Sequence, residues 1–165
     1  MLSHLIVTEA KKPLRETTHM HNYWVFVVVD HKGRKAPNAA EIFENRVRKR
    51  FWALNPKGAH ARKLQEGDKV VLCMAGKYSR GFAGQAILGS SLRKITGRER
   101  EQLHGLPSRG FSHCVRFKRV KPFKQIRCLG DYRGKVSFIN GAKHPRLPQG
   151  SVIKIDRSQY HKLAH

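Results

Sequence analysis

The chain has 165 residues, 34 of them Lys or Arg and 11 Asp or Glu, so a length typical of one domain carries a formal net charge of +23. Because a polyanion usually neutralises so strong a positive charge, we expect nucleic acid as the partner. We expect no membrane association, because no run approaches about 18 apolar residues and no predicted helix combines an apolar face with a basic one.

The first predicted elements follow an N-terminal extension, residues 1–22, which has no hydrophobic period. Residues 23–29, YWVFVVV, form a nearly continuous β-branched and aromatic run, which predicts a strand buried on both faces. Asn38 and Glu41 have the spacing of a capping box, which predicts a helix that begins there and ends in basic residues. A short strand, residues 51–54, is predicted directly after it.

The remaining elements are mostly strands. Gly67-Asp68 predicts a turn before a buried strand over 70–75, which a loop over 77–81 joins to a partner strand over 82–90 as a hairpin. Further on we predict a helix over 96–104 capped by Thr96, an alternating strand over 113–126, a strand or helix edge over 135–139, a strand over 151–155 and a helix capped by Asp156. So few helices between strands predict a mixed, strongly bent sheet.

The cysteines show no spacing typical of a metal site. Cys73, Cys114 and Cys128 form no Cys-x-x-Cys pair, and they form no zinc-finger set with the histidines. This pattern predicts reduced thiols in a cytoplasmic protein that uses no metal and no other cofactor.

The order of these motifs resembles the EVE domain, a sister of the YTH domain in the PUA-like superfamily. The resemblance covers roughly residues 23–162 and is carried by Tyr23-Trp24, Trp52, Gly67-Asp68-Lys69-Val70-Val71, Phe82-Ala83-Gly84-Gln85-Ala86, Val136-Ser137-Phe138-Ile139 and residues 156–160. Ala53 stands where the family usually has Gly, and residues 96–112 have no counterpart. The resemblance implies an α+β domain over residues 23–165, a PUA-like, strongly curved mixed β-barrel with flanking helices.

The resemblance also implies a base flipped into an aromatic pocket, methylated adenine in YTH domains and modified cytosine in EVE domains. Stacking on one ring contributes about 1–3 kcal/mol, so a pocket needs more than one wall to offset the cost of unstacking the base. Trp52 is the first predicted wall, because the tryptophan of the family aligns there. The other predicted pocket residues are Trp24, Tyr78, Phe138, Asp30, Asn55 and Ser79. Both tryptophans also fit a core, and Asp30 and Asn55 also fit turns.

Basic residues gather in two groups that we predict to contact phosphates, although charge runs are also typical of solvated faces. The first group lies directly before Trp52 and the second lies in a stretch, residues 109–130, that contains no acid. The predicted contacts are Arg46, Arg48, Lys49, Arg50, Arg80, Arg116, Lys118, Arg119 and Lys121, with Lys124 and Arg127 beside them.

These features together predict a binding module that recognises a modified base, with methylation as the expected mark, by flipping, and they favour DNA over RNA. Such a module would be the targeting domain of a modification-dependent restriction or defence system, joined to an effector nuclease or motor domain. The alternative is a structural or processing RNA-binding protein without a base pocket. We predict no catalytic residue, because the sequence has no nucleophile elbow, phosphate-binding loop or metalloprotease motif. A third interpretation is a nucleoside-directed enzyme of the related ASCH kind.

Overall fold

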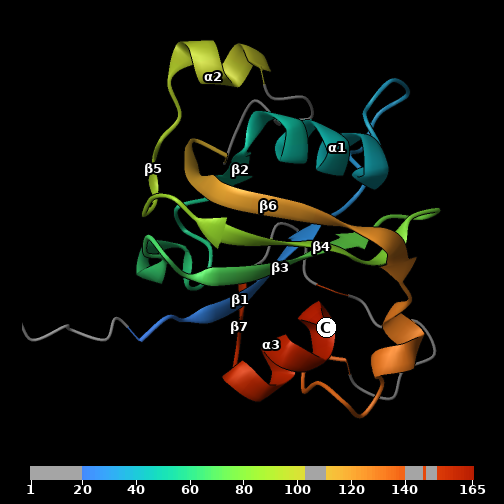
Figure 1. Cartoon of the computed structure of the whole chain (residues 1–165). Coiled ribbons are helices and arrows are strands. Elements are labelled where there is room, and N and C mark those ends of the chain that lie inside the picture. The colour runs from blue at the N-terminus through green and yellow to red at the C-terminus, as the bar shows by residue number, and fades with distance from the viewer. Residues whose placement is uncertain (1–19, 103–110, 140–146, 148–151) are drawn as a thin grey trace, which may run out of the picture.

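One mixed sheet dominates the computed structural model (Figure 1), which describes residues 20–102, 111–139, 147 and 152–165. The strand order within this part of the chain is β2-β6-β4-β3-β1-β7, with β5 paired to β6. The strands are β1 (Tyr23–Val28), β2 (Phe51–Leu54), β3 (Lys69–Ala75), β4 (Arg80–Leu88), β5 (Arg93–Lys94), β6 (His113–Arg127) and β7 (Val152–Ile155). Strands β1 and β3 are parallel and every other pair is antiparallel.

The sheet curls because β6 is long and changes partners along its length. Its first residues, 113–116, pair with β2, and the stretch from Phe117 to Arg127 pairs with β4 with two register shifts. Such irregularities increase the local bend of a sheet. The result is a curled half-barrel with flanking helices, which confirms the predicted α+β fold class.

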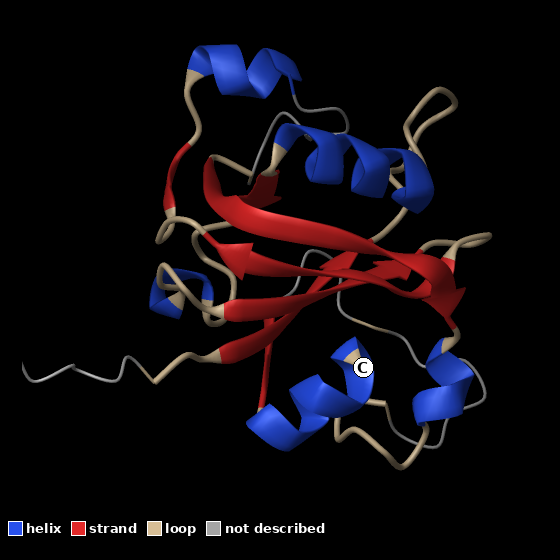
Figure 2. Cartoon of the chain, viewed as in Figure 1, coloured by secondary structure: helices blue, strands red, loops and turns tan. Residues whose placement is uncertain are grey.

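The helices begin where the capping patterns predicted. Helix α1 (Ala39–Lys49) and helix α3 (Arg157–Ala164) both have reciprocal capping boxes, from Asn38 with Glu41 and from Asp156 with Gln159. Thr96 and Glu99 exchange hydrogen bonds of 3.2 Å at the start of α2 (Gly97–Gln102). Two short 3-10 helices complete the set, η1 (Ala61–Lys63) and η2 (Leu129–Tyr132). Figure 2 shows α1 and α3 on opposite sides of the sheet.

Each face of the sheet has its own core, which explains the continuous apolar sequence of β1. Trp24 and Phe26 face the α1 side with Trp52 of β2, whereas Val25 and Val27 face the α3 side. Full burial of each such apolar side chain contributes about 1.5–3 kcal/mol. The prediction of a first strand buried on both faces is therefore confirmed.

One predicted element is wrong. Residues 135–139 form turns, neither a strand nor a helix edge, and they follow η2, which the sequence did not predict. Val136 and Ile139 are nonetheless buried in the core on the α3 side, so their apolar character reflects packing from a turn. Strand β5 and helix η1 were also not predicted. Residues 1–19 of the predicted extension, residues 103–104 of the predicted helix and residue 151 lie outside the described residues.

Candidate nucleic-acid interface

Helix α3 leaves part of its side of the sheet uncovered. It packs against β1, β3 and β4, through Tyr160 and Leu163 among others. The second half of β6 receives no comparable cover from the described residues, and no residue from Lys118 to Arg127 is buried. The face of β4 and β6 beside α3 is therefore open to solvent.

A cavity of about 480 Å³ lies on this open face. Gln85 and Ile87 of β4 and Arg119 and Lys121 of β6 line it, four residues that contribute both apolar and cationic groups. The remaining lining residues are Arg50, Lys69, Ala86, Val120, Tyr160, His161 and His165.

Two further cavities extend the first in opposite directions. One, of about 460 Å³, shares Lys69, Ile87 and Arg119 with it and adds His21, Glu66, Gly67 and Lys118. The other, of about 780 Å³, shares Gln85, Lys121 and His165 and continues along β6 to Arg127, Asp131 and Tyr132. Because neighbouring cavities share lining residues, the three form one continuous depression, which we call the basic groove.

The charge of the basic groove is strongly one-sided. Its lining contains seven Lys or Arg residues and two acids, Glu66 and Asp131. The cations are Arg50, Lys69, Lys118, Arg119, Lys121, Lys124 and Arg127. A concave surface of one sign concentrates the field and attracts ligands of the opposite charge.

Aromatic groups of α3 form one wall of the groove. The Tyr160 hydroxyl donates to Gln85 Oε1 at 3.2 Å, and burial and the neighbouring Tyr23 raise the pKa of Tyr160. Tyr160 is therefore a neutral hydrogen-bonding group at physiological pH. The rings of His161 and His165 stack with centroids 5.3 Å apart and planes 18° apart.

Arg127 ties the end of β6 to α3. Its guanidinium lies 4.0 Å from the centroid of the Phe123 ring, and Nη1 donates to the carbonyl oxygen of Leu163 at 2.5 Å. These contacts fix the far end of the groove, where Phe123 and Arg127 both contribute to the lining.

The two predicted tryptophan walls lie in the core on the α1 side. Trp52 is 3% exposed, with its ring centroid 5.7 Å from that of Phe26 and 6.1 Å from that of Phe117. Trp24 is 1% exposed, and its Nε1 donates to Asp68 at 2.8 Å. Neither ring has an open face in this structure, so both occupy the core position that was the alternative interpretation.

The predicted polar pocket residues hold backbone groups. Asp30 accepts from Ala39 N–H at 2.8 Å and from Lys77 N–H at 2.6 Å, which links the start of α1 to the turn between β3 and β4. Asn55 accepts from Lys57 N–H at 2.9 Å in a local turn. Ser79 accepts at its carbonyl oxygen from Gly76 N–H in the same β3–β4 turn.

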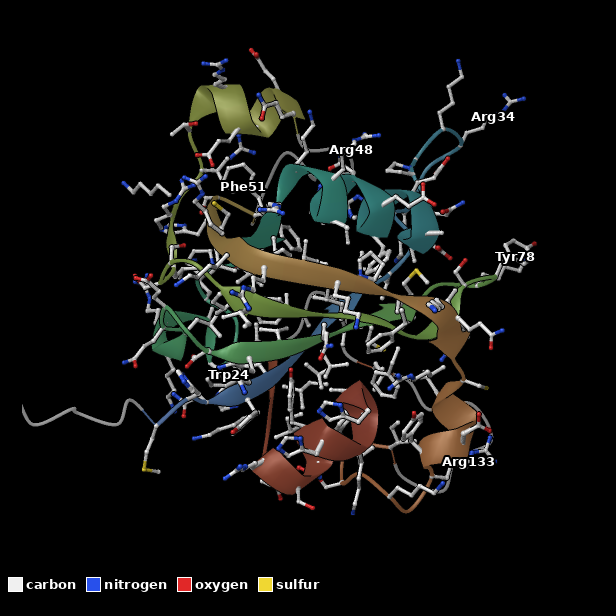
Figure 3. The ribbon with its side chains drawn as sticks, in the orientation of Figure 1. Trp24, Arg34, Arg48, Phe51, Tyr78 and Arg133 are labelled. Atoms are coloured by element: carbon white, nitrogen blue, oxygen red, sulfur yellow. The ribbon has the colours of Figure 1, made fainter. Side chains whose placement is uncertain are left out.

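The remaining two predicted pocket residues lie apart from each other and from the tryptophans. Phe138 is half-buried against Phe82 in the core on the α3 side. Tyr78 is 85% exposed and projects from the tip of the β3–β4 hairpin (Figure 3). The structure therefore does not bring the seven predicted residues together in one pocket.

Most of the predicted phosphate contacts are on the surface, but Arg46 is not. Arg46 is 4% exposed, its Nη1 donates to Asn45 Oδ1 at 2.8 Å, and burial lowers its pKa to about 10. It follows Ile42 by four residues, so it lies on the buried face of α1, and this site prediction is corrected. Arg48, Arg50, Arg80, Arg116, Lys118, Arg119 and Lys121 are exposed and Lys49 is half-buried.

Sequence reasoning placed Arg50, Lys118, Arg119 and Lys121 at an anionic ligand, and all four line the basic groove. It missed Lys69, Gln85 and Tyr160 and the paired His161 and His165. Lys69 directly follows the Gly67-Asp68 turn, which was the one available signal. Gln85 lies on β4, whereas Tyr160, His161 and His165 lie on or at the end of α3, where the spacing of the two histidines places them on one face. Nothing in the sequence indicates that β4 and α3 meet.

Other kinds of site find little support in the described ranges. No group of three or more His, Cys, Asp or Glu is placed there to hold a metal ion. Burial raises the pKa of Cys73 to about 12 and that of Cys114 to about 11, so neither thiol is a nucleophile at neutral pH. Within the same ranges, no helix has the length and apolar character needed to cross a membrane.

No family model matches the chain, and no curated protein matches it in sequence. A structural-genomics protein from Pseudomonas putida is similar in fold, with a TM-score of 0.52 and 16% identity over 85% of this chain and 95% of its own. A hypothetical protein from Leishmania major has a TM-score of 0.51 and 14% identity over 86% and 91%. The YTH domain-containing protein mmi1, solved with RNA, has a TM-score of 0.49 and 11% identity over 87% and 80%, which carries no conclusion about a ligand. The first two likenesses show that the fold recurs in other proteins.

Proposed function

We propose that this protein binds nucleic acid through the basic groove. One observation carries the proposal: a continuous depression on the open face of β4 and β6 is lined by seven Lys or Arg residues against two acids. Strands β3, β4 and β6 and helix α3 all contribute to it. A polyanion that follows this depression meets a cation at each step along it.

The physical basis of binding is neutralisation of phosphates. Lys and Arg that contact a phosphate release the counterions condensed on the nucleic acid, and this release favours binding most at low salt. This contribution to the binding free energy requires no contact with a base and no preformed base pocket. The groove therefore supports most directly the alternative reached from sequence, a structural or processing RNA-binding protein without a base pocket, whose cationic surface supplies the affinity.

Recognition of a modified base is a second candidate function. The resemblance to the EVE domain supports it, whereas the buried Trp24 and Trp52 and the structural hydrogen bonds of Asp30 argue against the pocket predicted from those residues. The central cavity of about 480 Å³ is in the size range of small-ligand sites, and the Gln85 amide and the exposed rings of His161 and His165 line it. A base turned into the groove would meet these groups.

Two experiments test these proposals. Nuclear magnetic resonance titration with an unmodified oligonucleotide should shift the amide signals of residues 118–127 and 160–165, and shifts confined to other regions would refute binding in the groove.

Competition at fixed salt should then compare plain, 5-methyl-, 5-hydroxymethyl- and N6-methyl-substituted strands of DNA and RNA. A preference of about tenfold for one mark would favour base recognition, and equal binding would favour the cationic surface alone. The preference for DNA and the nuclease or motor partner stay predictions.

A further inference from the structure

The turn between β3 and β4 presents one aromatic ring to solvent. Tyr78 is 85% exposed, and Nζ of Lys77 lies 5.1 Å from the centroid of its ring. Because so much of the side chain is exposed, the ring retains an open face. An exposed aromatic residue alone is ordinary on a protein surface, so its surroundings decide whether it is a site.

Hydrogen bonds to Asp30 and within the turn fix the turn that carries Tyr78. Asp30 accepts from Lys77 N–H at 2.6 Å while its other carboxylate oxygen accepts from Ala39 N–H at the start of α1. Gly76 N–H donates to Ser79 carbonyl oxygen at 3.0 Å, and a β-carbon on Gly76 would collide with the Asp30 carboxylate. These contacts fix the backbone of the turn that carries the ring, and this preorganisation reduces the entropy lost when a ligand binds.

The base of this turn meets the end of the basic groove. Gly81, where β4 leaves the turn, packs so closely on β6 that a β-carbon there would lie 2.6 Å from Ile126 Cγ2. Ile126 and Arg127 line the last cavity of the groove, and Ile126 is 52% exposed. An exposed apolar residue thus lies between the basic groove and the β3–β4 turn that carries Tyr78.

We propose that the ligand of the groove is a single strand and that a base of this strand stacks on Tyr78 after the strand passes Ile126. The inference rests on the proposed binding of nucleic acid in the groove. Bases within a duplex are paired and stacked on each other, whereas an unpaired base has free faces for an aromatic side chain. Lys77 in the turn and the exposed Arg80 at the start of β4 supply cations for the neighbouring phosphates.

A series of labelled oligouridylates of increasing length tests the inference by fluorescence anisotropy. Strands confined to the groove should bind wild type and Tyr78→Ala equally. Once a strand is long enough to reach the hairpin tip, the affinity of wild type should rise by about 5- to 160-fold, the range that stacking of one base supports. Tyr78→Phe should keep this step because its ring still stacks, and Tyr78→Ala should lose it.

Three outcomes are decisive. A step lost in Tyr78→Ala and kept in Tyr78→Phe establishes the stacking site. An equal step in all three proteins refutes it while leaving the groove as the binding site. Absence of oligouridylate binding at every length refutes this inference, and absence of duplex binding as well refutes the proposed function. Tyr78 packs in no core, so an unchanged unfolding curve for Tyr78→Ala serves as the folding control.

Discussion

The paired replacement Arg119→Ala/Lys121→Ala should weaken the salt dependence of nucleic-acid binding. It should leave the free energy of unfolding nearly unchanged. Both side chains line the central cavity of the groove, and Arg119 and Lys121 are each shared with a neighbouring cavity. Both are also exposed, so their removal leaves no cavity in either core. Exposed substitutions of this kind change the free energy of unfolding by only about 0.5 kcal/mol.

The expected magnitude follows from the number of cations in the groove. On a single strand, each neutralised phosphate contributes about −0.7 to the slope of log K against log salt. If each of the seven cations meets one phosphate, the wild-type slope is about −4.9 and the variant slope about −3.5. Between 50 and 200 mM salt, wild type then loses roughly 900-fold in affinity and the variant roughly 130-fold.

The assay is fluorescence anisotropy with one oligonucleotide at four salt concentrations. Arg34→Ala/Lys35→Ala is the matched control, because it removes the same charge from two exposed residues in the loop between β1 and α1 (Figure 3). A local role of the groove requires the control slope to stay close to that of wild type. Equal slopes for the groove variant and the control would show that only net charge matters and would refute the reasoning.

Three further predictions concern the fold. Trp52→Ala should lower the free energy of unfolding by about 3–5 kcal/mol in urea denaturation, since the ring is buried against Phe26 and Phe117, and a loss below about 1 kcal/mol would contradict a core role. Asp68→Ala should cost roughly 3 kcal/mol in the same assay, because Trp24 Nε1 and the backbone N–H groups of Asn22 and Gln65 lose their acceptor. The hydrogen bond from Arg93 lowers the pKa of Glu99 to about 2. The ionised carboxylate therefore stabilises the fold fully above its ordinary pKa of 4.5, and this contribution to the free energy of unfolding is lost as pH falls toward 2. Arg93→Ala should raise the titration midpoint of Glu99 toward 4.5 in carboxyl-carbon NMR, and an unmoved midpoint would refute the pairing.

The elements that sequence predicted well are those decided by local or periodic signals. The capping pairs of α1 and α3 lie three residues apart, so their hydrogen bonds depend on little beyond the local chain. The apolar run of β1 predicted burial on both faces because every position along it is hydrophobic. The β3–β4 hairpin followed from two apolar runs around a short polar loop.

The candidate site depended on information that no single segment contains. The basic groove exists because α3, the last helix, covers β1, β3 and β4 and leaves the second half of β6 open. Lys69, Gln85, Lys121 and Tyr160 meet there from four elements, of which only β3 and β4 are neighbours in the chain. Sequence patterns report the composition of each segment, but exposure depends on which other segments pack against it.

The same reason explains why the sequence could predict a ligand class but not the site that would bind it. A net charge of +23 belongs to the chain in any conformation, so the expectation of a polyanionic partner did not require the fold. The role of an individual side chain depends on its neighbours in space. Trp52 is buried because Phe26 and Phe117 close over it, and Arg46 is buried because it lies on the buried face of α1, whereas Tyr78 is exposed because its turn extends beyond the sheet. Only the tertiary structure decided which rings and which cations a ligand can reach.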